Sequence, residues 1–207
     1  MKEWKGNSDS VRSRLSINKA HTTKGRETDD FYATDPKAIE MLIGAAPHIF
    51  HQARKNGTPI WEPACGTGNL AKYLTKSGFV VYASDLKDRG FGEVHVDFLN
   101  TKIDRCPPII LTNPPYSLAN EFILHALDIL PDGGVYIALM NITYLCGQKR
   151  YATIYSKGIL REVYLFKKRI ECWRNNDREM YGGKAMVDFA WYVFQKGYNG
   201  QPTLYWL

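Results

Sequence analysis

Short apolar segments alternate with amphipathic ones along most of this chain, and this alternation restricts the fold more than any other feature of the sequence. Apolar runs of roughly four to eight residues are typical of buried strands, whereas apolar positions repeated every three or four residues are typical of helices. Asp35-Pro36 is typical of a helix start. Strands are predicted over residues 59–63, 79–84, 93–98, 109–112, 135–140, 162–166 and 187–194, and helices over 70–76, 118–130 and 149–156.

The strand–helix–strand order predicts an α/β fold with a doubly wound, mostly parallel sheet of seven strands. No clear helical pattern separates the last two predicted strands, so we expect an antiparallel hairpin at one edge of the sheet. The length of 207 residues suits one domain. Residues 1–30 are polar, with seven basic and five acidic side chains, so we expect a flexible arm there and a single domain over residues 31–207.

The composition is that of a globular protein, with 44% apolar and 23% charged residues. No apolar run approaches the ~20 residues needed to span a bilayer, and residues 1–14 lack the apolar core of a signal peptide. These features predict a cytoplasmic protein with no membrane partner. The cysteines are far apart in the sequence, which predicts reduced thiols and no metal site. They are Cys65, Cys106, Cys146 and Cys172.

A glycine turn, Glu62-Pro63-Ala64-Cys65-Gly66-Thr67-Gly68, lies between a predicted strand and a predicted helix. Glycine lets the backbone turn tightly and lets a ligand lie against it. The turn carries two glycines and so falls short of the full dinucleotide fingerprint, and no Lys-Ser or Lys-Thr pair follows to form a phosphate loop. Such a turn is either structural or part of a nucleoside-binding site.

Acidic residues at the ends of three successive predicted strands favour the nucleoside site: Glu62, Asp85 and Asp97. In an open parallel sheet these ends converge on the binding crevice. A carboxylate in the position of Asp85 can bind both ribose hydroxyls. Asp97 can accept the amino group of an adenine or can simply cap the strand end, and Leu86 and Phe98 are candidates to cover the two ring faces.

The chemistry is predicted from Asn113-Pro114-Pro115-Tyr116, which follows a buried strand. The prolines hold the backbone in an extended form and leave its carbonyl groups exposed. The Asn113 side-chain oxygen and the Pro114 carbonyl can accept both hydrogens of a planar amine, which frees the nitrogen lone pair for attack. Tyr116 offers a ring on which a flipped-out base can stack. The alternative is a strand-terminating turn without a catalytic role.

These motifs resemble those of S-adenosylmethionine-dependent DNA adenine-N6 methyltransferases. The turn that begins at Glu62 is similar to the family's cofactor motif, and the segment that begins at Asn113 is similar to its catalytic motif. Phe31-Tyr32-Ala33-Thr34 is similar to the N-terminal cofactor lid. The motif order is that of the gamma type, and the C-terminal segments look like those of small phage-type enzymes.

The resemblance implies a Rossmann-like class I methyltransferase fold with S-adenosylmethionine as cofactor. It places the methionine part against Glu62 and the glycine turn, the ribose against Asp85 and the adenine against Asp97. The predicted cofactor-binding residues are Phe31, Tyr32, Thr34, Glu62, Pro63, Ala64, Cys65, Gly66, Gly68, Asp85, Leu86, Asp97 and Phe98. The predicted catalytic residues are Asn113, Pro114, Pro115 and Tyr116.

Positive charge is concentrated late in the chain. Residues 146–184 contain ten basic and four acidic residues, a balance of +6 that equals the net charge of the whole chain. Interleaved aromatic residues suit phosphate contacts and base stacking, although such a run is often only a solvated surface. The predicted DNA-binding residues are Lys149, Arg150, Lys168, Arg169, Trp173, Arg174 and Arg178, with Trp173 as a second wall for the flipped base.

The function expected from these observations is methyl transfer to N6 of adenine in DNA, with DNA as the partner and with the oligomeric state open, a monomer included. Few residues remain beyond the predicted sheet, so we expect no separate target-recognition domain. Two alternatives stay open. The acceptor can be adenine in RNA or a protein glutamine amide, or the chain can be a catalytically silent partner of a larger methyltransferase.

Overall fold

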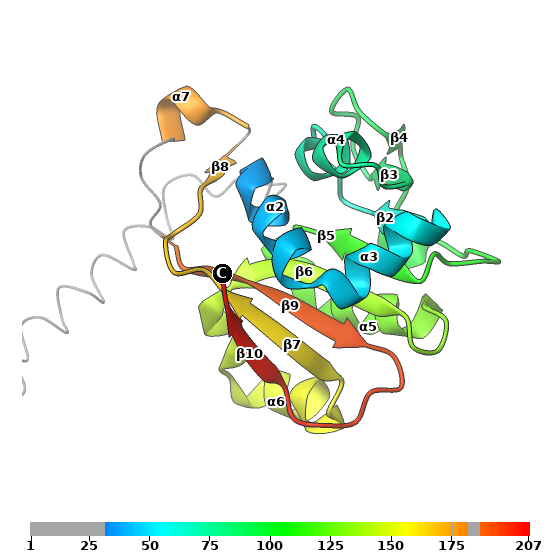
Figure 1. Ribbon diagram of the computed structural model, residues 1–207, viewed down its shortest axis with the longest axis vertical. Helices are drawn as coiled ribbons and strands as arrows, with labels where there is room; N and C mark the ends of the chain where they lie inside the picture. Colours follow the sequence, from blue (N-terminus) through cyan, green and yellow to red (C-terminus); the bar gives the residue numbers. More distant parts are fainter. Residues whose placement is uncertain (1–31, 175, 182–186) are drawn as a thin grey trace, which may run out of the picture. The chain divides into compact units, whose positions relative to one another are not determined.

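The main element of the computed structural model is an eight-stranded sheet (Figure 1). The structure describes residues 32–174, 176–181 and 187–207; the expected arm over residues 1–30 lies outside these ranges. In spatial order the strands are β10 (Thr203–Trp206), β7 (Leu160–Leu165), β9 (Phe189–Gln195), β6 (Val135–Asn141), β5 (Ile109–Thr112), β2 (Ile60–Glu62), β3 (Val81–Asp85) and β4 (Glu93–Val94). Only β9 runs antiparallel to its neighbours, β6 and β7.

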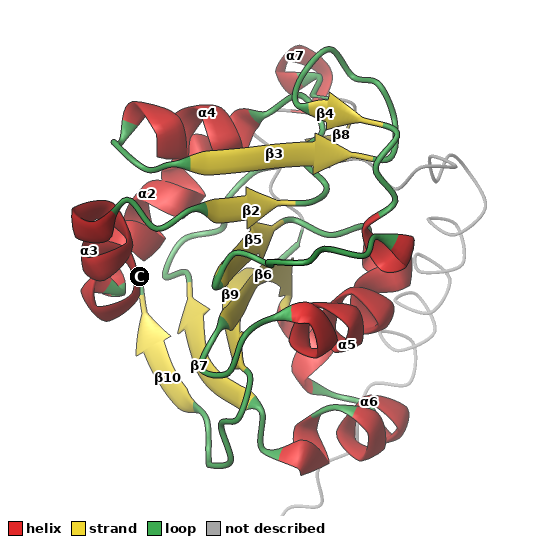
Figure 2. Ribbon diagram, turned by 90° about the vertical axis from the view of Figure 1, so that its right-hand side faces the viewer, coloured by secondary structure: helices red, strands yellow, loops and turns green. Residues whose placement is uncertain are grey.

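Helices cover both faces of this sheet (Figure 2). One face carries α2 (Pro36–Ala45), α3 (Pro47–Asn56) and α4 (Asn69–Lys76), and the other carries α5 (Ala119–Ile129) and α6 (Gln148–Thr153). The helix predicted to start at Asp35-Pro36 does so, because the Asp35 side chain accepts a hydrogen bond from the Lys37 backbone N–H. Short 3₁₀ helices lie over Phe98–Asn100, Tyr116–Leu118, Ile142–Leu145 and Tyr155–Lys157.

Alternate residues of the central strands enter two separate cores, one on each face. Along β6, Ile137 and Leu139 pack beneath α2 and α3, whereas Tyr136 and Ala138 face α5. A strand buried on both faces must be apolar at nearly every position, which is why these strands are continuous hydrophobic runs in the sequence. The predicted doubly wound α/β fold is therefore confirmed.

The edges of the sheet differ from the predicted arrangement. The last two predicted strands, β7 and β9, pair antiparallel toward one edge as expected, with β9 between β7 and β6 and with one further strand outside β7. The edge strand is β10, which had no sequence prediction because its four residues are all exposed and lack a two-residue apolar period. At the opposite edge the predicted strand 93–98 shrinks to Glu93–Val94, since the chain turns at His95, where φ is 63°.

A second, two-stranded sheet joins segments far apart in the sequence. β1 (Tyr32–Thr34) pairs antiparallel with β8 (Cys172–Arg174), and Thr34 is the register partner of Cys172. A short helix, α7 (Arg178–Tyr181), follows β8. This pairing holds the segment before α2 beside the connection between β7 and β9.

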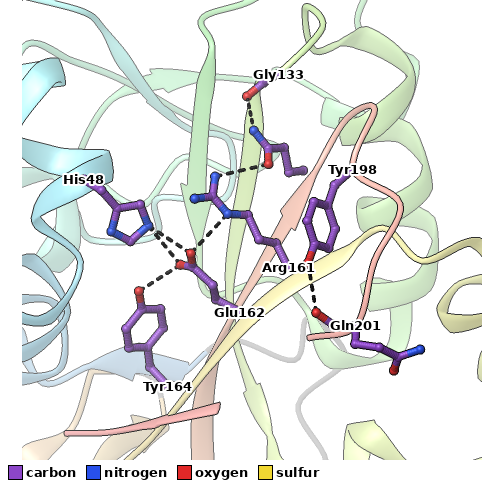
Figure 3. A network of polar contacts seen from close by, with 8 residues as sticks. His48, Gly133, Arg161, Glu162, Tyr164, Tyr198 and Gln201 are labelled. Atoms are coloured by element: carbon purple, nitrogen blue, oxygen red, sulfur yellow. Dashed lines mark hydrogen bonds and ion pairs between the residues drawn. The ribbon is translucent and has the colours of Figure 1, made fainter. Parts of the chain in front are cut away.

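A buried carboxylate ties α3 to the sheet (Figure 3). Glu162 of β7 is 4% exposed and binds His48 Nε2 at 3.0 Å, Arg161 Nε at 3.1 Å and the Tyr164 hydroxyl at 2.8 Å. Three partners compensate the cost of burying this charge. The cluster lies near the amino end of β7, so we assign it a structural role.

No helix in the described part of the chain is long and apolar enough to cross a membrane.

Ile110 tests the packing of the central strand, because it is fully buried on β5 against α5. We expect Ile110→Ala to lower the free energy of unfolding by about 2–4 kcal/mol through lost burial and a residual cavity. Urea denaturation measures this change. Val80→Ala is the control, since Val80 is 53% exposed, and an equal loss in both variants would contradict the assigned core.

Candidate active site

The residues predicted to do chemistry gather at one edge of the sheet. Since β2, β3 and β5 run parallel, their carboxyl ends share that edge. Glu62 and Asp85 are the last residues of β2 and β3, and Asn113 follows the last residue of β5. Residues separated by about 20 to 50 positions in the sequence are thereby neighbours along the edge.

The glycine turn between β2 and α4 adopts backbone conformations that favour glycine. Gly66 and Gly68 have φ values of 55° and 81°. A Cβ on Gly68 would lie 2.2 Å from the ring of Phe91, so no side chain fits there unless that ring moves. Phe91 itself lies between Gly90 and Gly92, in the loop after β3. The backbone of the turn therefore approaches the Phe91 ring closely.

Asp85 fastens this turn to the end of β3. Its Oδ2 accepts the Gly66 N–H at 2.8 Å and its Oδ1 accepts the Lys87 N–H at 2.9 Å. The residue is 9% exposed. Each carboxylate oxygen can accept a further hydrogen bond, so Asp85 can hold the turn and still bind a ligand hydroxyl.

Glu62 is a buried acid with an unused hydrogen-bond acceptor. It is 2% exposed, and its Oε2 has no hydrogen-bond partner among the described residues. Burial raises the pKa of Glu62 well above its ordinary value, the backbone hydrogen bond at Ala71 lowers it, and the nearby Asp85 raises it further. A buried oxygen without a partner costs free energy unless a ligand satisfies it.

Asp97, the third predicted acid, and its neighbour Phe98 both make contacts within the protein. Asp97 caps the 3₁₀ helix over Phe98–Asn100, since its Oδ1 accepts the Leu99 N–H at 3.1 Å, as in the capping alternative. Phe98 is 2% exposed and packs against Trp61 in the core, with ring centroids 5.2 Å apart. The structure thus places Phe98 in the core, away from a ligand face, while Leu86 is 54% exposed.

The carboxamide of Asn113 is held from one side only. Its Nδ2 donates to the Tyr32 carbonyl at 2.9 Å and to Thr34 Oγ1 at 3.0 Å. Its Oδ1 is buried and has no hydrogen-bond partner within the described ranges. The side chain therefore presents one unsatisfied acceptor at the carboxyl edge of β5.

The two prolines and Tyr116 complete this segment. The Pro115 carbonyl accepts the Leu118 N–H at 2.9 Å, which starts the 3₁₀ helix that contains Tyr116. The Tyr116 ring contacts those of Tyr32 and Phe189, with a centroid distance of 5.9 Å in each case. The predicted lid and catalytic segments are therefore in direct contact.

β8 brings a cysteine into this group. Cys172 is the register partner of Thr34 across the small sheet, and its thiol lies near the Thr34 and Tyr116 hydroxyls. Burial raises the pKa of the thiol to about 12, against the lowering effect of those two hydroxyls. Cys172 is therefore a neutral thiol at physiological pH.

The predicted DNA-binding residues occupy different environments. Lys149 and Lys168 are exposed, and Arg169 forms an ion pair with Asp188 at 2.7 Å. Arg150 lies over the Tyr144 ring at 4.5 Å and donates to the Cys146 carbonyl, so part of it serves local structure. Trp173 is 5% exposed, so little of its ring surface is available to contact a flipped base.

Some predicted residues lie beyond what the structure describes. Phe31 is outside the described ranges, and so are the side chains of Arg174 and Arg178. Among the described residues, no group of three or more His, Cys, Asp and Glu side chains is placed to hold a metal ion. A cavity of about 200 Å³ at the same edge of the sheet is lined by Ile142, Leu165, Phe166, Arg169, Asp188, Phe189 and Trp206.

Sequence reasoning missed three residues that the structure brings to the site: Phe91, Cys172 and Phe189. Phe91 carried a signal, since an aromatic residue between two glycines lies in a segment typical of turns. Cys172 and Phe189 carried none, because their contacts with Thr34 and Tyr116 depend on the pairing of β8 with β1 and on the position of β9.

The chain matches no protein-family model and no curated protein sequence. Among solved structures, a protein from Listeria monocytogenes proposed to be a class I S-adenosylmethionine-dependent methyltransferase has a TM-score of 0.59 and 13% identity over 97% of this chain and 73% of its own. A proposed RNA methyltransferase from Pyrococcus horikoshii has a TM-score of 0.57 and 16% identity, covering 89% and 98%.

A type I restriction-modification methyltransferase subunit from Streptococcus thermophilus is similar as well. Its TM-score is 0.59 with 16% identity over 88% of this chain, which spans only 48% of that subunit. At these identities the similarity establishes the fold. The chain has the Rossmann-like α/β fold that these methyltransferases share.

The buried carboxyl of Glu62 predicts a pH dependence of stability. Because the pKa of Glu62 is raised in the folded state, the folded protein retains a proton that the unfolded chain has lost, and stability falls as pH rises through this window. We expect Glu62→Gln to be more stable than the wild type, by a margin that grows by roughly 1 kcal/mol per pH unit above about pH 4.5. Urea denaturation from pH 4 to 8 measures it.

Glu40→Gln on α2 is the matched control, since Glu40 is exposed. A margin for Glu62→Gln that does not change with pH would contradict the raised pKa.

Proposed function

We propose that this protein transfers a methyl group from S-adenosylmethionine to the N6 amino group of adenine in DNA. The observation that carries the proposal is the Asn113 carboxamide, whose buried Oδ1 has no partner among the described residues while its Nδ2 is bound by β1. An acceptor held in this way suits a planar amine that enters with its hydrogens pointing at the protein. The similarity of the fold to methyltransferases supports the same reading.

The residues at the ends of β2 and β3 fit S-adenosylmethionine. The unpartnered Oε2 of Glu62 suits the ammonium group of the methionine part, because a bound cation would favour the ionised carboxylate that burial disfavours and would supply the missing hydrogen bond. Gly66 and Gly68 add no side chains of their own to the turn, and the Phe91 ring lies against Gly68. Asp85 has acceptor capacity for ribose hydroxyls. The cofactor, when bound, supplies an electrophilic methyl group on a sulfonium.

The chain's own residues orient the acceptor nitrogen. Asn113 Oδ1 and the Pro114 carbonyl accept the two amine hydrogens, which draws the nitrogen from planar toward tetrahedral geometry and directs its lone pair away from the ring. Among the described residues the Pro114 carbonyl accepts no backbone hydrogen bond, whereas the Pro115 carbonyl does. The proton leaves the nitrogen after attack, when the methylated amine is acidic, so no general base is needed beforehand. Positioning is therefore the main contribution of the protein.

The flipped base would stack on Tyr116, as aromatic residues do for extruded bases. In the structure Tyr32 already lies against that ring at 5.9 Å. An entering base must therefore share the Tyr116 face with Tyr32 or displace it. Lys149 and Lys168 are exposed and suit phosphate contacts, and Arg174 and Arg178 are proposed to join them.

A methylation-free bacterial host provides the test. Expression of the wild-type chain should introduce N6-methyladenine, detected by mass spectrometry of digested host DNA. Asn113→Ala should abolish the modification, because the acceptor loses its anchor, while S-adenosylmethionine binding measured by calorimetry stays within about twofold. Asn56→Ala at the exposed end of α3 is the control and should leave the modification at the wild-type level.

The same cells separate the alternatives. N6-methyladenine confined to RNA, or N-methylglutamine in protein, would replace DNA as the acceptor while retaining the chemistry. A purified chain that binds S-adenosylmethionine but methylates none of the three would favour a silent partner subunit. Unimpaired methylation by Asn113→Ala would contradict the mechanism itself.

The proposed cofactor site predicts a loss of affinity in Asp85→Ala. We expect the dissociation constant for S-adenosylmethionine to rise at least about tenfold, because the variant removes the ribose contact and releases the turn from β3. Calorimetry measures the constant, and thermal unfolding checks that the variant is folded. Asp88→Ala in the same loop is the control, since Asp88 is exposed and its Oδ1 accepts the Gly90 N–H within the loop. Equal affinities in the two variants would refute the role of Asp85.

A further inference from the structure

Asn113 can act as an acceptor only if its carboxamide is oriented with Oδ1, and not Nδ2, toward the incoming amine. A flip of the amide group exchanges oxygen for NH₂ and would present two donors to an incoming amine, which is itself a donor. Carboxamides rotate freely unless their partners distinguish the two ends. The partners of Asn113 therefore decide whether the proposed site can work.

Two groups on β1 make this distinction. The Tyr32 carbonyl, 2.9 Å from Asn113 Nδ2, can only accept a hydrogen bond, so it must face the NH₂ end. Thr34 Oγ1 lies 3.0 Å from the same nitrogen, and Thr34 is 2% exposed, so water does not compete for this contact. With both N–H groups bound to β1, the oxygen is turned to the opposite side.

A hydroxyl group can donate as well as accept, so Thr34 needs a reason to present its lone pair to Asn113. Cys172, the register partner of Thr34, supplies one, because its sulfur lies beside the Thr34 hydroxyl and can accept the hydroxyl hydrogen. If the Thr34 hydrogen points at the sulfur, its lone pairs remain for Asn113. The register of the small sheet keeps this contact in place, since Thr34 and Cys172 are paired across β1 and β8.

We propose that Thr34 is a positioning residue that fixes the carboxamide of Asn113 with Oδ1 toward the acceptor amine. This inference rests on the proposed methyl transfer and changes the role of Thr34, which the family resemblance assigns to cofactor binding. The Thr34 side chain instead accepts a hydrogen bond from Asn113 Nδ2 and lies beside its register partner Cys172. Thr34 acts through Asn113 and needs no contact with cofactor or substrate.

Kinetics of three variants test the assignment. Thr34→Val keeps the shape of the side chain but removes the acceptor, and we expect kcat to fall roughly tenfold or more, while the dissociation constant for S-adenosylmethionine stays within about twofold. Thr34→Ser restores the hydroxyl and should recover kcat to within about threefold. Thr153→Val removes an exposed threonine hydroxyl on α6 that donates to the Lys149 carbonyl, and it should match the wild type.

A spectroscopic readout is independent of the substrate. In ¹⁵N-labelled protein without ligand, the Asn113 side-chain NH₂ signals are identified by their loss in Asn113→Ala. Both protons should exchange slowly with water in the wild type and in Thr34→Ser. In Thr34→Val one of the two should exchange at least about tenfold faster, because only the bond to the Tyr32 carbonyl remains.

The outcomes separate this inference from the function on which it rests. A wild-type protein that methylates no DNA, RNA or protein overturns the proposed function and this role with it. An active wild type with Thr34→Val impaired only in S-adenosylmethionine affinity overturns the positioning role and leaves the function intact. Unchanged proton exchange in a folded Thr34→Val overturns the hydrogen bond itself.

Discussion

The parallel pairing of β2 with β3 and β5 is the constraint on which the candidate site depends. Parallel strands end at the same edge, so this pairing alone places Glu62, Asp85 and Asn113 together. The strands remain in register because both faces are buried beneath helices, where a slip of one residue would exchange the two cores. The stability of the sheet and the geometry of the site therefore have the same physical origin.

The site combines buried polar groups that are satisfied with a few that are not. Asp85 uses one oxygen to hold the glycine turn and the other to accept the Lys87 N–H, whereas Glu62 and Asn113 each retain one buried oxygen without a partner among the described residues. Such atoms cost stability, and folded proteins keep few of them. Their location at the carboxyl edge of a doubly wound sheet, where this class of fold binds ligands, is the physical basis of the proposed function.

Thr34 and Cys172 extend the site beyond the two motifs. They come from opposite ends of the domain and meet only because β1 pairs with β8. Through Thr34 the segment before the first helix binds Asn113, and through Cys172 the connection after β7 lies beside Thr34. In the proposed reaction these contacts would orient the Asn113 carboxamide with its oxygen toward the amine. Such orientation uses neutral hydrogen-bonding groups, so the composition of the chain does not reveal it.

The sequence by itself determined the α/β class, the central strands and the Glu62, Asp85 and Asn113 positions, because buried strands and glycine turns have local signatures. The tertiary structure decided the rest. It placed Phe98 in the core, left Asp97 as a helix cap, inserted β9 between β6 and β7, and added β10. Burial and hydrogen bonding between residues distant in sequence depend on how strands pair, and no local pattern encodes that choice.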